Sequence, residues 1–347
     1  MPPKTMARIA LLTVLIPISA SAQAPKETLL ALSKRDHTLS IVDPTSLKVL
    51  SKVPVGEDPH EVIASADGRT AYVSNYGGGV YNTLAVIDLA EQKPLPAIDL
   101  GPLRGPHGLD FVAGKVWFTA EAAKAIGSYD PVSKKLDLIL GTGQNRTHMI
   151  LVSGDLKRII TTNVSSGTVS IIEKTAAREG QPAGPPRGPG APMGNPGGDW
   201  DETVVKVGNG SEGFDVSPDA KEIWVANAQD GTISIIDIAA KKVTDTLRAN
   251  VGGANRLKFT PDGHKVFVSS LRLGTVAVLE AGTRKEIKRI EVGHGAAGIV
   301  MQPDGSRAFV ACTPDNYVAV IDLKSLEVTG HIDVGQQPDG LAWAVTH

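Results

Sequence analysis

Cysteine is almost absent from this chain of 347 residues, in which Cys312 is the only one. A single cysteine excludes an intramolecular disulfide. The formal net charge of −2 gives no basic field, so we expect no nucleic-acid partner. After the N-terminal segment, no stretch approaches about 18 consecutive apolar residues, and we therefore expect no transmembrane segment in the mature chain.

Several motifs of nucleotide and redox proteins are also missing. The sequence has no P-loop, no G-x-G-x-x-G between a strand and a helix, and no C-x-x-C-H. We therefore expect no nucleotide, no flavin and no covalently attached haem. There is no G-x-S-x-G nucleophile elbow, and no residue near Cys312 in the sequence would activate its thiol.

The N-terminus has the three parts of a secretory signal peptide. Lys4 and Arg8 form a basic start, residues 9–19 are apolar, and residues 20–22 (Ala-Ser-Ala) form a small-residue cleavage site. Residues 1–22 are therefore predicted to be a signal peptide. We expect an exported protein, in a bacterial periplasm or secreted, because export without disulfides suits the periplasm.

The rest of the chain, residues 23–347, repeats itself about every 42 residues. The repeat is clearest in VGNGSEGFDVSPDAKEIWVANAQDGTISIIDIAAKKV, from Val207, and VGHGAAGIVMQPDGSRAFVACTPDNYVAVIDLKSLEV, from Val292. Frequent β-branched residues, interrupted by glycine and proline, exclude a helical solenoid. Four short strands per unit predict an all-β propeller, with a pair of β-sandwiches or a parallel β-helix as alternatives.

Alignment of the repeats predicts seven blades. The last unit stops after one strand and the first begins one strand late, so the C-terminal strand should complete the first blade. We expect a closed, monomeric seven-bladed β-propeller. The position six residues before the turn proline, or its equivalent, recurs at intervals of 41 to 64 residues, at His60, His107, His148, Glu212, Asn255, Ala297 and Asp339.

Two stretches resemble a known repeat family. Residues 59–75 read P-x-x-x-x-x-S-x-D-G-x-x-x-Y-V-S-N, and residues 224–237 contain W-V-A-N and T-I-S-I-I-D. They resemble the YVTN family of β-propeller repeats, and the resemblance covers essentially the whole mature chain. It implies the propeller fold but no particular activity, because a fold does not fix a function.

One segment interrupts the repeats. Residues 178–198 (REGQPAGPPRGPGAPMGNPGG) have almost no apolar side chains and cannot bury enough surface to order themselves. We predict a disordered loop between the third and fourth strands of the fourth blade. That loop should lie at the end of the barrel opposite to the aligned histidines, so we expect it not to act as a lid.

The aligned positions form the candidate site. Equivalent positions of the innermost strands form a ring at one end of a propeller channel, so three histidines and a glutamate should meet there. Imidazole nitrogens and carboxylate oxygens are ligands of Zn²⁺ and related ions. We predict a divalent ion, Zn²⁺, Mn²⁺ or Mg²⁺, bound by His107, His148 and Glu212. A solvated polar channel without metal is the alternative.

The remaining polar positions of the mouth follow from propeller topology. Asn255 and Asp339 continue the ring. The loops 75–82 and 163–167 connect second to third strands, and they should therefore flank the ring. We predict Asn75 and Asn163 as further residues of the channel mouth.

One blade contains the stretches Gly105-Pro-His-Gly-Leu, Val116-Trp-Phe-Thr and Ala125-Ile-Gly-Ser-Tyr-Asp-Pro. This blade resembles a blade of the streptogramin (virginiamycin B) lyases. The resemblance implies a seven-bladed propeller with a magnesium-dependent lyase site in which His107 is one of the histidines. The family's acid position is occupied here by Ala120, and Glu121 stands one residue later. In a strand, such a shift is expected to turn the side chain to the opposite face.

A further stretch, residues 71–79 (AYVSNYGGG), resembles a segment of seven-bladed lactonases of the phosphogluconolactonase type. This resemblance implies catalysis by polar and charged residues at the channel mouth. The glycines would equally suit a hairpin turn, because glycine tolerates positive φ.

Two functions follow from these patterns. The first is a scaffold that binds a small ligand, a metal or a protein at a histidine-rich channel mouth. The alternative is a metal-dependent lyase or lactonase-type hydrolase, in which the metal polarises a carbonyl group. In that case His60 and His107 are the predicted catalytic residues, with His60 as the general base.

Overall fold

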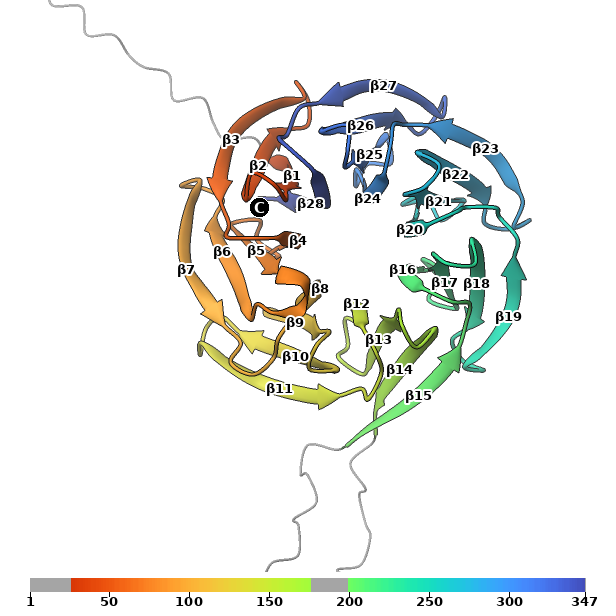
Figure 1. The fold of residues 1–347 in the computed structure, drawn as a ribbon, viewed down its shortest axis with the longest axis horizontal. Helices are drawn as coiled ribbons and strands as arrows, with labels where there is room; N and C mark the ends of the chain where they lie inside the picture. The colour runs from red at the N-terminus through yellow and green to blue at the C-terminus, as the bar shows by residue number, and fades with distance from the viewer. Residues whose placement is uncertain (1–25, 176–198, 347) are drawn as a thin grey trace, which may run out of the picture.

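The structure, a computed structural model, describes residues 26–175 and 199–346. These residues form seven four-stranded antiparallel sheets around a central channel, which confirms the predicted seven-bladed propeller (Figure 1). The predicted signal peptide, residues 1–22, and the predicted loop 178–198 lie outside the described residues. Within the described ranges, no helix has the length and apolar character needed to cross a membrane.

The innermost strand of each blade lies against the channel (Figure 1). The residue at the second position of each of these strands is one of the seven aligned positions. Sequence alignment of the repeats therefore corresponds to a real ring of equivalent places in the fold. The seven innermost strands are β4 (Pro59–Ala64), β8 (Pro106–Val112), β12 (Thr147–Val152), β16 (Ser211–Val216), β20 (Ala254–Phe259), β24 (Ala296–Met301) and β28 (Pro338–Val345).

The first blade joins the two ends of the chain. Strand β28 pairs antiparallel with β1 (Glu27–Ser33), so that Trp343 lies opposite Leu29. The sheet order is β28-β1-β2-β3. The C-terminal strand thus completes the first blade, as predicted, and the ring closes without a free inner edge.

The second and third strands of each blade form the core, because each blade packs both of its faces against neighbouring blades. Their side chains are therefore buried in continuous runs rather than at alternate positions, as in β18. Between the fifth and sixth blades, Trp224 packs edge to face on Phe259, with ring centroids 5.6 Å apart. Counted outward from the channel, the second strands are β1 in the first blade and then β5 (Thr70–Asn75), β9 (Lys115–Ala120), β13 (Arg158–Asn163), β17 (Glu222–Asn227), β21 (Lys265–Ser270) and β25 (Arg307–Cys312). The third strands are β2 (Thr38–Asp43), β6 (Thr83–Asp88), β10 (Ala125–Asp130), β14 (Thr168–Lys174), β18 (Thr232–Asp237), β22 (Thr275–Glu280) and β26 (Tyr317–Asp322).

The outermost strands face solvent and end the blades. Strand β19 alternates between exposed and half-buried side chains, as the repeat pattern predicts for a strand with one covered face. The outer strands are β3 (Lys48–Pro54), β7 (Lys93–Asp99), β11 (Lys135–Gly141), β15 (Trp200–Lys206), β19 (Lys242–Leu247), β23 (Glu286–Glu291) and β27 (Glu327–Ile332).

The aspartates that end many third strands start the next turn. The backbone N–H of Val132 donates to Asp130 Oδ1 at 2.8 Å, and that of Lys324 donates to Asp322 Oδ1 at 3.0 Å. Such side chains cap the turn by mimicking a backbone acceptor. The repeated Val/Ile-Asp pattern is therefore a strand followed by its turn signal.

Candidate functional site

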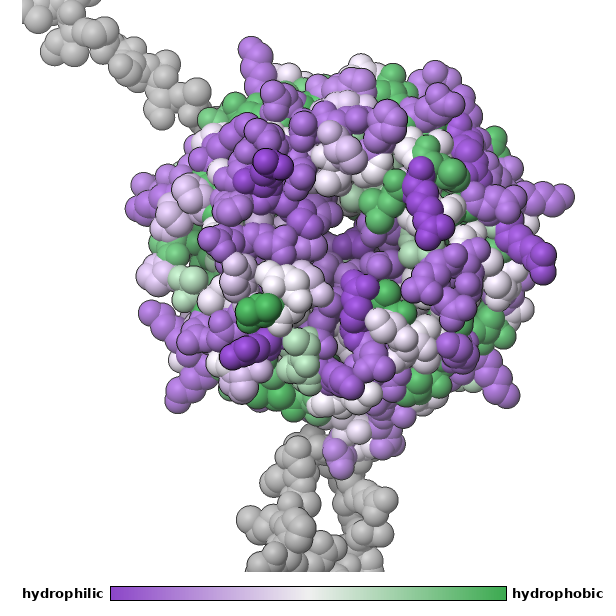
Figure 2. Space-filling model, in the orientation of Figure 1, coloured by the Kyte–Doolittle hydropathy of each residue, from purple (hydrophilic) through white to green (hydrophobic). Residues whose placement is uncertain are grey.

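A cavity of about 410 Å³ opens at the channel mouth, where the innermost strands begin. All seven aligned positions line it, and loops between the strands add Lys34, Tyr76, Arg146 and Leu271 to its wall. In the view along the channel, hydrophilic residues gather around the central opening (Figure 2). The aligned lining residues are His60, His107, His148, Glu212, Asn255, Ala297 and Asp339.

A backbone irregularity in the innermost strands accompanies the ring positions. The pairing of β8 with β9 shifts between Pro106 and Leu109, a stretch that includes His107. The same shift occurs in β4, β12, β16, β20 and β24. A bulge of this kind re-aims a side chain. The ring residues can therefore turn toward the channel instead of following the sheet face.

Close packing between neighbouring blades explains the glycine of the Pro-His-Gly motif. A Cβ atom at Gly108 would lie 2.4 Å from the backbone oxygen of His148 on the next blade. The equivalent glycines, Gly213, Gly298 and Gly340, face the same contact at 2.2 to 2.4 Å. Only glycine leaves room for this approach. The glycine of the Pro-His-Gly motif thus has a packing role between the third and fourth blades.

The three histidines lie side by side along one half of the ring. The ring centroids of His60 and His107 are 4.9 Å apart, and those of His107 and His148 are 3.8 Å apart. They stand on consecutive innermost strands β4, β8 and β12. The sequence alignment brought these side chains together correctly, although 41 or more residues separate them in the chain.

His148 lies between two carboxylates. Its Nδ1 hydrogen-bonds to Glu121 Oε1, and its Nε2 lies 2.7 Å from Glu212 Oε2. Burial opposes the charged imidazolium, but Glu212 and Glu121 together raise the pKa of His148 to about 9. Burial likewise opposes ionisation of Glu212, yet His148 lowers its pKa to about 2.

Glu121 is a site residue that the sequence reasoning missed. Its side chain was expected to face away from the mouth, but strand β9 ends at Ala120 and the strand alternation ends with it. Glu121 is buried in the following turn, where its Oε2 accepts a hydrogen bond from the Tyr76 hydroxyl at 2.6 Å. Arg146 Nε donates to the same oxygen at 3.4 Å. The only sequence signal was that Glu121 stands next to the acid position of the lyase-like blade.

His107 is buried and neutral. Burial, reinforced by the positive charge of His148, lowers its pKa well below the ordinary value. Among the described residues its Nδ1 has no hydrogen-bond partner. A buried polar atom without a partner is unusual and calls for a physical reason. A neutral imidazole nitrogen in such a place can serve as a metal ligand.

One group of potential ligand atoms in this site is close enough to share one ion. Ligand atoms of His107, Glu121 and His148 all lie within 4.8 Å of one another. Glu212, which was predicted as the acidic ligand, is not in this group and instead contacts the other nitrogen of His148. Two imidazoles and one carboxylate form a donor set typical of Zn²⁺ sites with an open position.

His60 is surrounded by charged groups. Lys34 Nζ lies 2.9 Å from its Nε2, and Asp339 Oδ2 lies 3.4 Å from its Nδ1. Asp58 Oδ1 lies 3.2 Å from Nε2, and this contact lowers the pKa of Asp58 to about 2. Both ring nitrogens of His60 are therefore engaged in the free protein. Its assignment as a general base stays a prediction.

An ion pair crosses the channel. Arg256 on β20 contacts Glu61 on β4, and β20 and β4 belong to blades that are not neighbours. Both residues occupy the position that follows the ring residue, where four other blades have glycine. The two charged side chains at this position are thus paired with each other.

Two predicted residues of the mouth do not line the cavity. Asn75 Nδ2 donates to Thr83 Oγ1 at 3.2 Å, and Asn163 Nδ2 donates to Thr168 Oγ1 at 3.1 Å. Each asparagine ends a second strand and bonds to the third strand of its own blade. Their role visible here is to tie the loop between these strands, while Asn255 and Asp339 do line the cavity.

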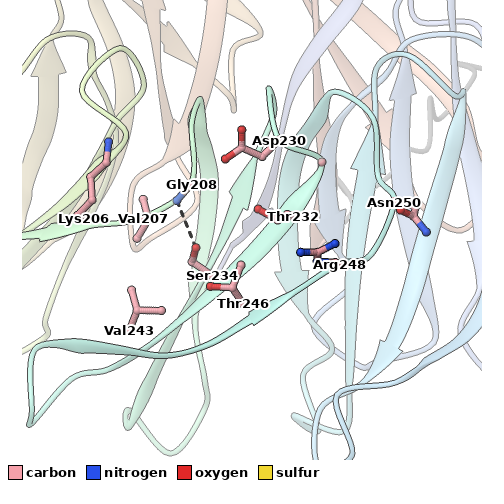
Figure 3. A pocket seen from close by; sticks show the side chains of 11 residues that line it. Lys206, Val207, Gly208, Asp230, Thr232, Ser234, Val243, Thr246, Arg248 and Asn250 are labelled. Carbon is pink, nitrogen blue, oxygen red and sulfur yellow. Dashed lines mark hydrogen bonds between the residues drawn. The ribbon is translucent and has the colours of Figure 1, made fainter.

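A second, larger cavity of about 720 Å³ lies beside the fifth blade (Figure 3). Its carboxylate, Asp230, accepts a hydrogen bond from the Asn209 backbone N–H at 2.6 Å, and Lys206 Nζ donates to Ser166 O at 3.1 Å. No histidine lines it. Size alone does not make this groove a chemical site, so the channel mouth remains the stronger candidate.

Comparisons with solved structures agree with the fold. A functionally unknown protein from Desulfotomaculum acetoxidans has 15% identity and a TM-score of 0.73, over 92% of this chain and 99% of that chain. A candidate 6-phosphogluconolactonase from Bacteroides fragilis has 17% identity and a TM-score of 0.72, over 92% and 98%. Hydrazine synthase from Kuenenia stuttgartiensis has 18% identity and a TM-score of 0.68, over 85% and 92%. At these identities the likeness shows the fold alone.

Sequence comparison finds one family model that matches part of the chain. A search of the curated proteins finds no match to the chain. Residues 198–307 match the model of the YNCE-like beta-propeller family. This match confirms the expected resemblance to repeat propellers. The chain is therefore a seven-bladed β-propeller of which residues 198–307 match the YNCE-like model.

Proposed function

We propose that this propeller is a scaffold that binds a divalent metal ion at its channel mouth, and a small molecule beside that ion. The observation that carries the proposal is the closeness of His107, Glu121 and His148, whose ligand atoms lie within 4.8 Å of one another. All three residues are buried, and His107 and His148 line the open cavity. Three protein ligands leave a metal coordination position for a ligand from solution.

The groups around the cluster support this assignment. A metal-binding histidine usually has its other ring nitrogen against a carboxylate, and Glu212 has this place beside His148. The second carboxylate oxygen of Glu121 is held by Tyr76 and Arg146, while its first oxygen contacts His148 Nδ1 and would bind the ion in place of that contact. Glu212 would then orient a ligand rather than be one.

The second candidate is a metal-dependent lyase or lactonase-type hydrolase at the same mouth. It is favoured by His60, whose ring centroid lies 4.9 Å from that of His107 on the cavity wall. A bound ion would polarise a carbonyl group of the substrate. For His60 to accept a proton, Lys34 would have to move away from its Nε2.

We place the protein outside the cytoplasm, in a bacterial periplasm or secreted. Residues 1–22 support this placement through their basic start, apolar run and small-residue end. The chain acts there as a monomer, without a nucleic-acid partner, in line with its small net charge.

Metal content tests the proposal. The mature chain from Gln23 is purified, reconstituted with Zn²⁺, Mn²⁺ or Mg²⁺, and analysed beside a His107→Ala/His148→Ala variant. The control is His294→Ala, because His294 is an exposed histidine outside the cavity. We expect one ion per chain in the wild type and control and none in the double variant. Equal metal in all three proteins would refute the site.

Two single substitutions distinguish the roles of the carboxylates Glu121 and Glu212. Glu121→Gln removes a proposed ligand and should abolish stoichiometric binding. Glu212→Gln removes an orienting group and should weaken binding by about 10- to 100-fold. The opposite order of effects would make Glu212 the ligand, as the sequence alone suggested.

A further inference from the structure

The mouth cavity has two chemically different sides. The side formed by blades one to five carries the histidines and most of the charged groups. On the sixth and seventh blades, Leu271, Gly295, Ala297 and Pro314 line the wall, together with two uncharged polar residues and Arg256, whose charge is paired with Glu61 across the channel. Ala297 is the one apolar residue among the seven ring positions.

The apolar side is accessible from the cavity. Leu271 is 41% exposed, although it is a large aliphatic residue on the cavity wall. Ala297 and Gly295, which line the same cavity, are small residues without polar side chains. Exposed apolar surface inside a concave site usually receives an apolar part of a ligand.

The opposite side presents a cation at the rim. The side chain of Arg146 is 43% exposed, and its one side-chain hydrogen bond within residues 26–175 and 199–346 runs from Nε to Glu121. Lys34 is less available, since Asp339 and Asp58 lie 3.4 Å and 3.8 Å from its Nζ. A guanidinium with free N–H groups is suited to bind a carboxylate through two parallel hydrogen bonds.

We infer that the ligand of this cavity is a small organic carboxylate with a short aliphatic body. The carboxylate lies between Arg146 and the metal cluster, and the hydrocarbon lies against Leu271, Ala297 and Pro314. This inference rests on the proposed metal-binding function for one end of the ligand only. A volume of about 410 Å³ is at the small end of ligand-binding pockets, which suits a short chain.

A homologous series of probes tests it. Acetate, butyrate and hexanoate are titrated into the Zn²⁺-loaded mature protein, and their dissociation constants are measured by ligand-observed NMR. Each buried methylene should tighten binding by about fourfold, which corresponds to about 0.8 kcal/mol. Butyramide, which has the same body without the charge, should bind at least tenfold more weakly than butyrate.

Variants test which part of the ligand each side of the cavity binds. Ala297→Leu should weaken the binding of hexanoate and leave the binding of acetate and Zn²⁺ unchanged. Leu271→Ala, at a half-exposed position that folding should tolerate, should flatten the dependence on chain length. Leu273→Ala is the matched control, because Leu273 is exposed on the same loop but does not line the cavity. Arg146→Gln should weaken the binding of acetate, butyrate and hexanoate by the same factor.

The outcomes distinguish this inference from the proposed function. Bound Zn²⁺ with no dependence on chain length, or with butyramide equal to butyrate, overturns the inference and leaves the metal site intact. Absence of Zn²⁺ binding overturns the proposed function. The same series is then measured on metal-free protein, where tighter binding of longer chains supports the apolar side and equal binding overturns it.

Discussion

In the metal-free protein, His148 should stay protonated well above neutral pH. Its imidazolium lies between Glu121 and Glu212, which together raise its pKa from 6.5 to about 9 despite complete burial. A group whose pKa is higher in the folded state stabilises the fold when protonated. The stabilisation is full below pH 6.5 and is lost as the pH rises through 9.

The magnitude follows from the two pKa values. A rise from 6.5 to about 9 corresponds to about 3 kcal/mol of unfolding free energy. The neighbouring His107 does not mask this effect, because its lowered pKa destabilises the fold only below pH 6.5. Glu212 titrates lower still, with a pKa of about 2. The interval from pH 6.5 to 9 therefore isolates His148.

The assay compares wild type with His148→Gln in the presence of a chelator. Guanidinium unfolding at pH 6.5, 7.5, 8.5 and 9.5 should show the difference between the two proteins shrinking by about 3 kcal/mol as pH rises. NMR titration of isotope-labelled histidines reads the same pKa directly. An apparent pKa at or below 6.5 for His148 would refute the assignment of two carboxylate partners.

Three further predictions concern the frame around the site. Arg256→Ala should lower the free energy of unfolding by about 3 to 5 kcal/mol, because it leaves the carboxylate of Glu61 buried without its partner. In chemical unfolding, the double variant Arg256→Met/Glu61→Leu should recover most of this stability. Trp224→Ala should lower the free energy of unfolding, measured in denaturant, by about 3 to 5 kcal/mol, because the indole ring is fully buried between two blades. A decrease below about 1 kcal/mol would contradict that packing. Burial raises the pKa of the Cys312 thiol to about 12, so iodoacetamide at pH 8 should modify it only in denaturant, as mass spectrometry would show.

The sequence determined the fold and most of the ring. The repeat period, the turn signals and the split first blade are local patterns, and they required seven blades with β28 closing the first. Because equivalent positions in a repeat have equivalent places in space, alignment alone brought His60, His107 and His148 to one channel mouth. No contact information was needed for that step.

The tertiary structure decided which groups actually meet. Glu121 comes from a turn outside the repeat alignment and reaches His148, because strand β9 ends one residue before it. Arg256 and Glu61 look like two unrelated departures from glycine in the sequence, yet they form a pair across the channel. Asn75 and Asn163 look like site residues but bond within their own blades.

The physical reason for this division is the range of the interactions. Strand periodicity and turn chemistry act within about ten residues, and the repeat multiplies them around the ring, so the sequence displays them directly. Side-chain contacts across the channel depend on where a strand ends, on how a bulge aims the chain, and on which neighbour is long enough to reach. Those distances exist only once the seven blades have closed.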